Sequence, residues 1–555
     1  MQKKIGNVIL DYTYYKGQDL YSDGIIEDNI LDIVKTGKEK DILYSSNEWP
    51  ILYHLSDIRE NILEWYPFCE NAKTLEIGSG CGALTGLLSR KSKDVTCIEL
   101  SEKRSLINAY RNQDCENITI MLGNFQDIII KDKYDYITLI GVWEYAGLYV
   151  NDENPYLRML EIVKKFLKKD GKIIIAIENK MGLKYWNGAL EDHTSNLYSS
   201  LNDYVDDKHV RTFSKPEIEK IFKQLDINNY AFYYPVPDYK LPDVVYSDEI
   251  LPKPGAERNY RKDYNACRMY NFYDATASDQ ICQDSMYPYF SNSFLIITGE
   301  KNTKNYFQKY NRCRKENLRI KTEIYEENER IFIRKKALNE PSKKHIIQLK
   351  NNEKIWIGCL PALKYIEGKL EDDEYITQYI EGIDLDTLFY EYRNDADLFV
   401  QKYCYFIDTY LRPLNEDLVP FSMSDQFISI FGNNAPLNEV SLKITNIDLI
   451  FSNLRLTKDS QLYCFDYEWI YDFSIPYDYV LWRNATQLYS KYMVYLRSKL
   501  SLGEFLKSVG IHLDNIPIYN EMERNFANSV FGINDKENYL QNYRKIAINQ
   551  TIKFS

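Results

Sequence analysis

The sequence predicts an α/β fold in two parts, an open parallel sheet with helices on both faces and, after it, a second α+β unit. Two observations predict this division. Short apolar runs alternate with helix-like segments through the first 300 residues, as in a parallel sheet. The 555 residues also exceed what a single core organises. We therefore expect one domain over residues 1–300 and another over residues 301–555.

Composition narrows the class of protein. Apolar residues make up 45% and charged residues 27%, which is ordinary for a folded globular chain. No apolar run approaches the roughly 18 residues of a membrane span, and the ten cysteines include no C-x-x-C pair. The net charge of −12, without a long block of lysine and arginine, disfavours a nucleic-acid substrate. We expect a cytoplasmic protein with reduced thiols.

Seven apolar runs are the strands expected in the first domain. In chain order they read KTLEIGSG, DVTCIEL, ITIMLGN, YDYITLIGV, KIIIAIEN, YAFYYPVP and SNSFLIITG. A polar, tyrosine-rich segment at about residues 237–290 separates the sixth run from the seventh, and we expect it to be an insertion. The seventh strand then closes the domain near residue 300.

A glycine-rich turn follows the first strand. It has the pattern E-x-G-x-G-x-G and consists of Glu76, Gly78, Gly80 and Gly82. Glycine permits a tight turn and a close approach of the backbone to a ligand, and the next helix begins with free N–H groups. Glu99 ends the second strand, where a carboxylate can accept both hydroxyls of a ribose. The glycines alone leave the ligand open, because the same turn also fits the dinucleotide pattern G-x-G-x-x-A.

Three features of this domain together resemble class I S-adenosylmethionine-dependent methyltransferases. They are Glu76 before the glycines, GNFQDI after the third strand and the late strand SFLIITG. The resemblance implies a Rossmann-like sheet in which the glycine turn flanks the methionine and ribose of S-adenosylmethionine and Glu99 holds the ribose. It also implies that Asn124 and Phe125 lie against the adenine, although many members have an aspartate near Asn124. Beside the sulfonium it places Gly141, Trp143 and Glu144.

Two more segments are expected to face the ligands of this domain. Upstream, EWPILYHLSDIRENILEW resembles a helix over the cofactor, with Tyr53, His54 and Arg59 near the methionine carboxylate or, equally, in packing roles. After the fifth strand, ENKMGLKYWNGALEDHT places His193 next to Asp192 on the substrate side of the sheet. His193 is a candidate base or phosphate ligand, and the alternative is a loop histidine that only pairs locally.

The nature of the methyl acceptor stays open at this point. A hydroxyl acceptor needs a base, whereas an anionic acceptor such as a phosphate needs cations. The segment after the fifth strand supplies both kinds of group, and its charged residues include Glu178, Lys180, Lys184 and Arg211. A sugar hydroxyl and a phosphate oxygen therefore both fit the sequence.

The second half has a different pattern. KTEIYE and RIFIRKKAL suggest a new antiparallel sheet, and ADLFVQKYCYFIDTYLRPL has helical apolar spacing. Further on, Asp448 precedes Asn453 by five residues, and Asp466 follows thirteen residues after Asn453. This order resembles the two-lobed kinase fold, in particular its aminoglycoside and choline kinase-like branch. The resemblance implies that Asp448 orients or deprotonates an acceptor hydroxyl, while Asn453 and Asp466 hold Mg²⁺ on the phosphates of ATP.

The sequence departs from the kinase pattern in two places and leaves one residue of that pattern ambiguous. Lys335 is the strand lysine expected to contact ATP, with its neighbour Lys336 as the alternative. Asn446 stands where the kinase pattern has a histidine, two residues before the catalytic aspartate. NYFQKYNRCRKENLRIK, where a glycine-rich loop would cover the phosphates, contains no glycine.

A methyltransferase followed by a kinase-like domain resembles the bifunctional methyltransferase/kinases that terminate bacterial O-antigen polysaccharides. The resemblance covers residues 1 to about 500. It implies that an ATP-dependent kinase phosphorylates the terminal sugar of a lipid-linked glycan and that the methyltransferase caps this phosphate as a methyl ester. It leaves open a peripheral association with membrane-bound glycosyltransferases.

Two alternatives remain beside the bifunctional enzyme. In one, a sugar O-methyltransferase carries a kinase-like domain that only binds glycan or nucleotide, and the missing glycine loop favours this alternative. In the other, both domains are a scaffold for glycosyltransferases, which the complete glycine motif with Glu99 opposes. The spacing of Asp448, Asn453 and Asp466 favours the bifunctional enzyme.

Overall fold

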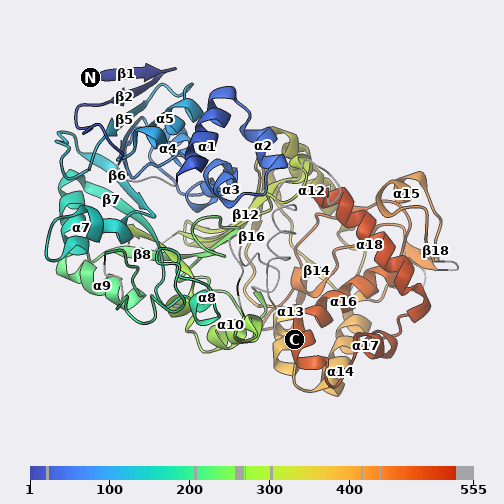
Figure 1. The fold of residues 1–555 in the computed structure, drawn as a ribbon. Coiled ribbons are helices and arrows are strands. Elements are labelled where there is room, and N and C mark those ends of the chain that lie inside the picture. The colour runs from blue at the N-terminus through green and yellow to red at the C-terminus, as the bar shows by residue number, and fades with distance from the viewer. Residues whose placement is uncertain are drawn as a thin grey trace.

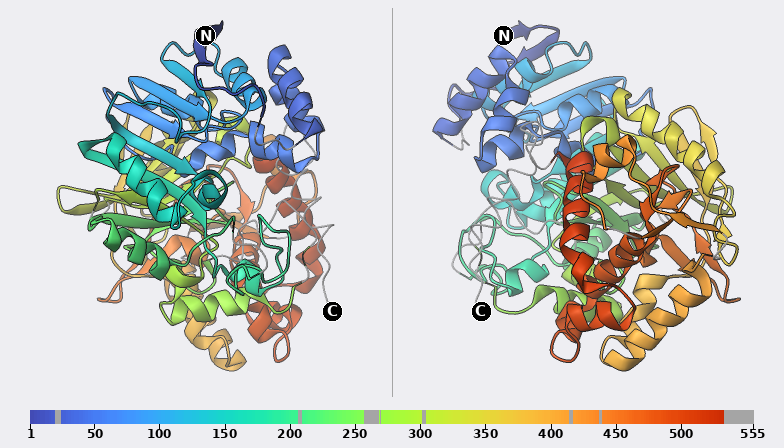
Figure 2. Two further views of the ribbon diagram at one scale, coloured as in Figure 1. Left: turned by 60° about the vertical axis from the view of Figure 1, so that its left-hand side comes forward. Right: turned by 90° about the vertical axis from the view of Figure 1, so that its right-hand side faces the viewer.

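The computed structural model describes residues 1–19, 24–205, 209–256, 268, 270–300, 304–413, 417–436 and 439–532. The first half of the chain lies on one side of the molecule and the last helices lie on the other, with the strands of the middle segment between them (Figure 1). Figure 2 shows the same arrangement from two further directions, with the amino terminus at the top of both views.

A parallel sheet forms the centre of the first half. Its strands are β3 (Lys73–Ile77), β4 (Asp94–Glu99), β5 (Ile118–Leu122), β6 (Tyr134–Ile140), β7 (Leu167–Glu178), β8 (Tyr230–Val236) and β10 (Ser293–Thr298). Their order in space is β5-β4-β3-β6-β7-β10-β8, and β10 runs antiparallel to both of its neighbours. All seven predicted strands are present, so the expectation of a Rossmann-like α/β sheet is confirmed.

Helices cover both faces of this sheet, which explains why its strands are apolar on both sides. The helices include α4 (Thr85–Lys91), α5 (Glu102–Arg111), α7 (Pro155–Phe166) and α9 (Lys215–Gln224). Consecutive residues of β7 belong to different cores, because side chains alternate along a strand. Ile175 packs in one cluster with Leu75, whereas Ile174 packs in the other with Leu84.

The amino-terminal residues extend this sheet and cover one end of it. The hairpin of β1 (Gln2–Ile5) and β2 (Val8–Asp11) pairs with β5 at the sheet edge. After it come α1 (Ile25–Thr36), α2 (Glu39–Ser45), α3 (Trp49–Leu55) and the 3₁₀ helix η1 (Asp57–Ile62). Ile30, Val34, Leu52 and Ile58 form a small core of their own beneath these helices.

The sheet does not stop at the predicted domain boundary. β9 (Val244–Ser247) pairs with β8 and also with β11 (Asn305–Tyr310), which leads into β12 (Ile320–Glu327), β13 (Arg330–Ala337), β16 (Glu374–Gln378) and β15 (Lys369–Glu371). In the described part of the chain, the result is one sheet of 15 strands instead of the new antiparallel sheet that the sequence suggested. The physical reason is that β9 leaves an open edge on which β11 pairs.

The segment at about residues 237–290, predicted to be an insertion, therefore includes the strand that joins the two halves. Besides β9 it contains α10 (Asp274–Gln283) and α11 (Tyr287–Phe290). Residues 257–267 and residue 269 lie outside the described residues, as do residues 533–555 at the end of the predicted second domain.

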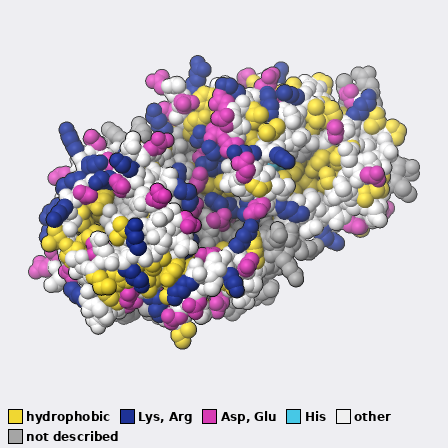
Figure 3. Space-filling view, turned by 90° about the horizontal axis from the view of Figure 1, so that it is seen from above, with side chains coloured by type: hydrophobic (Ala, Val, Ile, Leu, Met, Phe, Trp, Pro, Cys, Tyr) yellow, Lys and Arg dark blue, Asp and Glu magenta, His cyan; other side chains and the backbone are white. Residues whose placement is uncertain are grey.

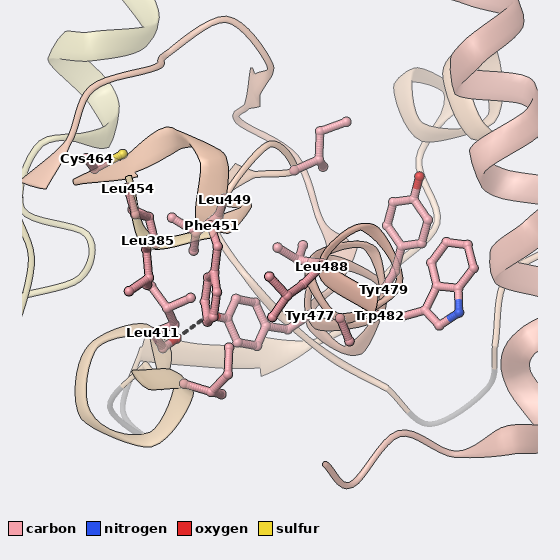
Figure 4. Packing of buried hydrophobic residues seen from close by; sticks show 14 of the residues in the cluster. Leu385, Leu411, Leu449, Phe451, Leu454, Cys464, Tyr477, Tyr479, Trp482 and Leu488 are labelled. Carbon is pink, nitrogen blue, oxygen red and sulfur yellow. Dashed lines mark hydrogen bonds between the residues drawn. The ribbon is translucent and has the colours of Figure 1, made fainter. Parts of the chain in front are cut away.

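The carboxy-terminal part is largely helical. Its main elements are α12 (Lys343–Trp356), α14 (Ala396–Phe406), α15 (Asp425–Phe431), α16 (Tyr477–Leu496), α17 (Leu502–Ser508) and α18 (Ile516–Phe531), with the short strands β21 (Leu454–Leu456) and β22 (Leu462–Cys464). Leu449, Phe451 and Leu454 pack with Tyr477 and Leu488 in a continuous apolar core (Figure 4). This packing anchors the chain around Asp448, Asn453 and Asp466.

Two surface features bear on the sequence-based expectations. Among the helices that the structure describes, none combines the length and the apolar content that a bilayer span requires. Acidic and basic side chains are interspersed over the face of the molecule that is seen from above (Figure 3).

Candidate active sites

A cavity of about 520 Å³ lies at the carboxyl ends of the parallel strands in the first half. Its volume is in the range of small-molecule sites, and its place is where open α/β sheets bind ligands. On the sheet side it is lined by Gly78, Glu99, Asn124, Phe125, Gly141 and Glu144. Helices α1 and α3 cover it with Ile26, Trp49, Pro50, Tyr53 and His54.

The glycine turn after β3 is specified by its surroundings. A Cβ atom on Gly78 would lie 2.6 Å from Val142, and one on Gly82 would lie 2.4 Å from the side chain of Asn108. Both glycines have positive φ angles. The N–H of Gly80 donates to the Glu99 carboxylate at 2.7 Å, and a second hydrogen bond, from the Ser101 N–H, has a length of 3.1 Å. The turn therefore fixes Glu99 at the cavity, where a ribose would meet it.

Glu76 lies behind this turn. Its buried carboxylate accepts a 2.6 Å hydrogen bond from the Thr85 hydroxyl, and burial raises the pKa of Glu76 to about 7. With Arg59 it lines a smaller hollow next to the main cavity. The Arg59 guanidinium donates to the backbone carbonyl of Lys240 at 2.8 Å and lies 4.4 Å from the ring centre of Tyr53. Tyr53 lines the main cavity, whereas Arg59 lines the smaller hollow and contacts the ring of Tyr53.

Most of the residues predicted to contact the adenine and the sulfonium line the cavity, but Trp143 packs behind it. Asn124 and Phe125 both line the cavity, and the Asn124 amide is fixed by a 3.3 Å hydrogen bond to the carbonyl of Tyr149. Trp143 is fully buried, and its ring stacks on Phe213 with 4.8 Å between centres. The indole thus packs in the core behind the cavity, while Gly141 and Glu144 from the same turn line it.

Three side chains meet at the end of the cavity that faces the expected acceptor. Glu144 follows β6, Glu178 ends β7, and His193 lies in the loop after α8 (Leu183–Trp186). One ligand-type atom of each lies within 4.8 Å of the other two. The imidazole Nδ1 is 3.1 Å from the Tyr145 hydroxyl, and its Nε2 is 3.6 Å from Glu178. One oxygen of Glu144, Oε2, is buried and has no hydrogen-bond partner among the described residues.

The three groups have very different affinities for protons. Burial, reinforced by the charge of Glu178, raises the pKa of Glu144 to about 8. Burial also opposes ionisation of Glu178, but Lys240 and His193 outweigh it and lower the pKa of Glu178 to about 2. For His193, the two neighbouring glutamates outweigh burial and raise the pKa to about 9. At neutral pH, Glu178 and His193 are therefore a charged pair, and Glu144 is the group whose protonation can change.

The cations near this cluster already face carboxylates. The ammonium group of Lys240 lies against Glu178 and also 2.5 Å from Asp192. Lys184 is 2.7 Å from the other oxygen of Asp192. The spacing of the cluster resembles a divalent metal site, but Lys240 supplies positive charge to Glu178 from within the protein. No sequence pattern singled out Lys240 beyond its place after the sixth strand.

Lys180 and Arg211, which the sequence offered as phosphate ligands, lie in a separate group. Lys180 is 2.7 Å from Asp203 and 3.0 Å from Glu217. Arg211 is 3.0 Å and 3.2 Å from the same two carboxylates. Neither residue lines the cavity.

In the second half of the chain, the amide side chains of Asn453 and Asn446 connect the segments that carry Asp448 and Asp466. Asn453 donates from its amide nitrogen to the carboxylate of Asp448 at 3.1 Å. Its amide oxygen has no hydrogen-bond partner in the described part of the chain, and such an oxygen suits a hard cation such as Mg²⁺. Asn446 accepts from the Asp448 N–H at 2.9 Å and donates to the Asp466 carbonyl at 3.3 Å. Asn446 therefore connects the two segments where the kinase pattern has a histidine.

The structure brings Lys335, and not Lys336, to this site. The Lys335 ammonium lies 2.8 Å from Asp466 and 3.9 Å from Glu468. Lys336 points to the other face of β13 and pairs with Glu374 at 2.6 Å. The sequence did not reveal a glutamate partner for Lys335, and that partner is Glu468, two residues after Asp466 in FDYEW.

Glu468 also faces other cations. It forms an ion pair with Arg314 and lies 2.7 Å from the imidazole of His345, which projects from α12. These contacts outweigh the effect of burial and hold the pKa of Glu468 far below its usual range. The oxygen atoms of Asp466 and Asn453 are of the kind that a divalent ion prefers, and the Lys335 ammonium lies beside Asp466.

Comparison with known proteins supports the first site. Residues 75–175 match a family model described as a methyltransferase domain. Ribosomal RNA small subunit methyltransferase A of Borreliella burgdorferi is 26% identical over 247 residues, which span 44% of this chain and 77% of that protein. A probable cobalt-precorrin-6B C(15)-methyltransferase (decarboxylating) of Methanococcus maripaludis is 35% identical over 69 residues, 12% of this chain and 38% of that protein.

Solved structures add little to this. The complex of phosphoethanolamine N-methyltransferase 1 of Haemonchus contortus with phosphoethanolamine and S-adenosylhomocysteine shares 15% identity. The alignment covers 50% of this chain and 51% of that one with a TM-score of 0.28, too low to carry weight. The family match, in contrast, runs from β3 into β7, the strands whose turns build the cavity with its glycines and Glu99. Residues 75–175 are the core of a methyltransferase domain.

Proposed function

We propose that this chain transfers the methyl group of S-adenosylmethionine to a hydroxyl group of a glycan. The observation that carries the proposal is the buried Glu144 carboxylate, which lines the cavity beside the Glu178–His193 pair and has an oxygen free of hydrogen bonds to the described residues. A hydroxyl is a weak nucleophile, and its attack on a methyl group needs a base in reach. Glu144 is placed to be that base.

The proposed reaction is a direct displacement. The acceptor oxygen forms a bond to the methyl carbon, the carbon–sulfur bond breaks, and S-adenosylhomocysteine leaves as a neutral thioether. The hydroxyl proton passes to Glu144. A bound sulfonium cation favours the ionised carboxylate and so lowers the pKa of Glu144 from about 8 towards neutrality. His193, which the sequence offered as the base, is better suited to hold Glu178 and the Tyr145 hydroxyl in place.

The family resemblance instead implies a phosphate as the methyl acceptor. A phosphate dianion needs cations that are free to bind it. Near the acceptor end of the cavity, Lys184 and Lys240 are already paired with Asp192, and the protonated His193 is paired with Glu178. This charge arrangement supports a hydroxyl acceptor over a phosphate.

The choice of a glycan rests on the resemblance to O-antigen-terminating enzymes alone. The name of the Borreliella relative points to ribosomal RNA as an alternative substrate. The net charge of −12 and the interspersed surface charges of Figure 3 disfavour a polyanionic partner.

A direct test uses S-adenosylmethionine with a labelled methyl group. The purified chain is incubated with neutral oligosaccharides, with the same sugars phosphorylated at their ends, and with ribosomal RNA. We expect label in the neutral oligosaccharides, with the methyl group located on a hydroxyl oxygen by mass spectrometry. Label in the phosphorylated sugars only, or in the RNA only, would overturn the proposal.

A second candidate function is phosphotransfer from ATP to a sugar hydroxyl in the other half of the chain. The observation that favours it is the contact network of Asp448, Asn453, Asp466 and Lys335, which joins segments more than 100 residues apart. Asn453 and Asp466 would hold Mg²⁺, which neutralises phosphate charge when bound, and Asp448 would orient the acceptor. Asp448→Asn is expected to abolish phosphate transfer while Mg-ATP still binds. Unchanged transfer would contradict this role.

A further inference from the structure

The strand register of the middle segment sorts its side chains onto two faces. Lys309 of β11 pairs with Thr322 of β12, and Thr322 pairs with Lys335 of β13. Directly paired residues on neighbouring strands project to the same face of a sheet. Lys309 and Lys335 therefore lie in one row, and this row faces Asp466, because Lys335 is in contact with it.

The opposite face has its own charges. Lys321 and Arg334 pair there with Glu64 and Glu323, and Lys336 pairs with Glu374. These contacts join the strands to the first half of the molecule and to one another. The lysines of the two faces therefore contact different parts of the molecule, although they alternate along the same short strands.

Lys309 is the unusual member of its row. Its side chain is exposed, and it forms neither a hydrogen bond nor an ion pair with the described residues. The surrounding protein and the nearby cations Arg314 and Lys335 nevertheless lower the pKa of its ammonium group. A lysine that solvent reaches and that lies near other cations is suited to bind an anion.

The ion pairs near Lys309 support the same conclusion. Three cations, Lys309, Arg314 and Lys335, face two carboxylates, Asp466 and Glu468. Lys335 pairs with Asp466, and Arg314 pairs with Glu468. Among the described residues, Lys309 is the cation of this group that has no carboxylate within ion-pair distance, so its charge is available to an anion.

The chain between β11 and β12 does not form the flexible glycine loop that would otherwise grip phosphates. Arg312 in this loop is 2.6 Å from Asp57 and donates to the Asn61 side chain at 2.6 Å. The N–H of Lys315 donates to the carbonyl of Val530 in α18 at 2.9 Å. The loop is tied at both ends to other parts of the molecule.

An apolar row runs beside the cationic row on the same face. Ile324 pairs with Ile333 and both side chains are partly exposed, whereas Phe307, which pairs with Ile324, packs against Tyr246 of the first-half core. Rows two residues apart along a strand are separated by roughly 7 Å. A flat aromatic base could lie under the apolar row with its phosphates under the lysines.

We propose that Lys309 binds the phosphate groups of a nucleoside triphosphate, as the cation that replaces a glycine-rich loop in this chain. The inference rests on the second candidate function above, because it assumes that the face of these strands beside Asp466 is a nucleotide site. Lys309 would contact the ligand directly and share the phosphates with Lys335. Arg314 would act indirectly, by neutralising Glu468.

The test compares Lys309→Gln with Lys336→Gln, a matched control that removes the same charge from the opposite face of the same sheet. Affinities for Mg-ATP and for adenosine are measured by calorimetry on the full chain. We expect Lys309→Gln to weaken Mg-ATP binding roughly tenfold, the loss of one charge-assisted contact, and to leave adenosine binding unchanged. Lys336→Gln should bind both ligands like the wild type. Unchanged affinity for S-adenosylhomocysteine verifies that both variants are folded.

Two results would count against the proposal in different ways. If wild-type protein binds Mg-ATP and Lys309→Gln binds it equally well, Lys309 has no such role, although the nucleotide site itself stands. Equal losses for Mg-ATP and adenosine would also overturn it, because adenosine carries no phosphate. If the wild-type chain binds no Mg-ATP at all, the phosphotransfer function fails, and this inference fails with it.

Discussion

The two sites are built from similar side chains but treat charge in opposite ways. In the first cavity, Glu144 is buried and has an oxygen without a partner in the described part of the chain, and burial raises its pKa to about 8. In the second site, Asp466 and Glu468 each contact a cation, and the exposed cation Lys309 forms no ion pair with the residues that the structure describes. A buried carboxylate with an oxygen that no described residue hydrogen-bonds suits proton transfer, whereas an exposed lysine without an ion pair to the described residues suits anion binding. The predictions below test this contrast.

The largest effect is expected for Glu144→Gln. An amide has nearly the same shape as the carboxylate but cannot accept a proton from a hydroxyl. We expect the turnover number for methyl transfer to fall by roughly 10²–10⁴-fold, the usual contribution of a positioned base, with unchanged binding of S-adenosylhomocysteine. Glu161→Gln, on the exposed face of α7, is the control and should retain wild-type turnover. Full activity of Glu144→Gln would show that Glu144 is not the base.

The pH dependence of methyl transfer sharpens the same point. The base acts only when ionised, and a raised pKa keeps its proton on at low pH. The rate should therefore increase with pH, by up to tenfold per unit, and level off at about pH 8 or somewhat below when the sulfonium is bound. In Glu144→Gln this dependence should disappear. A rate that falls as pH rises from 6 to 8 would instead indicate an essential acid.

Glu99→Gln should have a smaller effect, and one on binding. The carboxylate accepts hydrogen bonds from the N–H groups of Gly80 and Ser101, and an amide NH₂ in its place would direct a donor at a donor. Calorimetry should give an affinity for S-adenosylhomocysteine that is weaker by about one to two orders of magnitude. Mg-ATP affinity is the internal control and should not change. Equal weakening of both ligands would indicate a general loss of fold.

The smallest effect is expected where the two halves meet. Arg312→Ala removes the contacts to Asp57 and Asn61, and Asp57 is partly exposed, which weakens that ion pair. We expect a loss of about 1 kcal/mol in the free energy of unfolding, measured by chemical denaturation. Separate unfolding transitions in the variant, where the wild type has one, would indicate that this contact holds the halves together.

Features of the fold and the sites that depend on a short stretch of sequence could be predicted. Features that depend on contacts between distant segments could not. The strands and the glycine turn were predictable, because apolar alternation and glycine spacing can be recognised within short stretches of sequence. The spacing of Asp448, Asn453 and Asp466 likewise lies within 19 residues. Nothing local indicated that β9 would pair with β11, since strand pairing is a long-range choice of partner.

The charge arrangement at each site was equally hidden. Lys240 reaches Glu178 across two strand ends, and Lys309 owes its place to the register of β11 on β12. Trp143 illustrates the reverse case. Its position next to Glu144 suggested a contact with the cofactor, but successive residues of a tight helical turn face different ways, and the large apolar ring is the one that packs in the core.

The central claim is that the two sites act independently, the first on a hydroxyl. It is tested most directly by measuring methyl incorporation into a neutral oligosaccharide with and without ATP, in wild-type protein and in Asp448→Asn. The account predicts equal incorporation under all four conditions. Incorporation that requires ATP and disappears in Asp448→Asn would mean that the methyl acceptor is a phosphate made by the second site, and would contradict it.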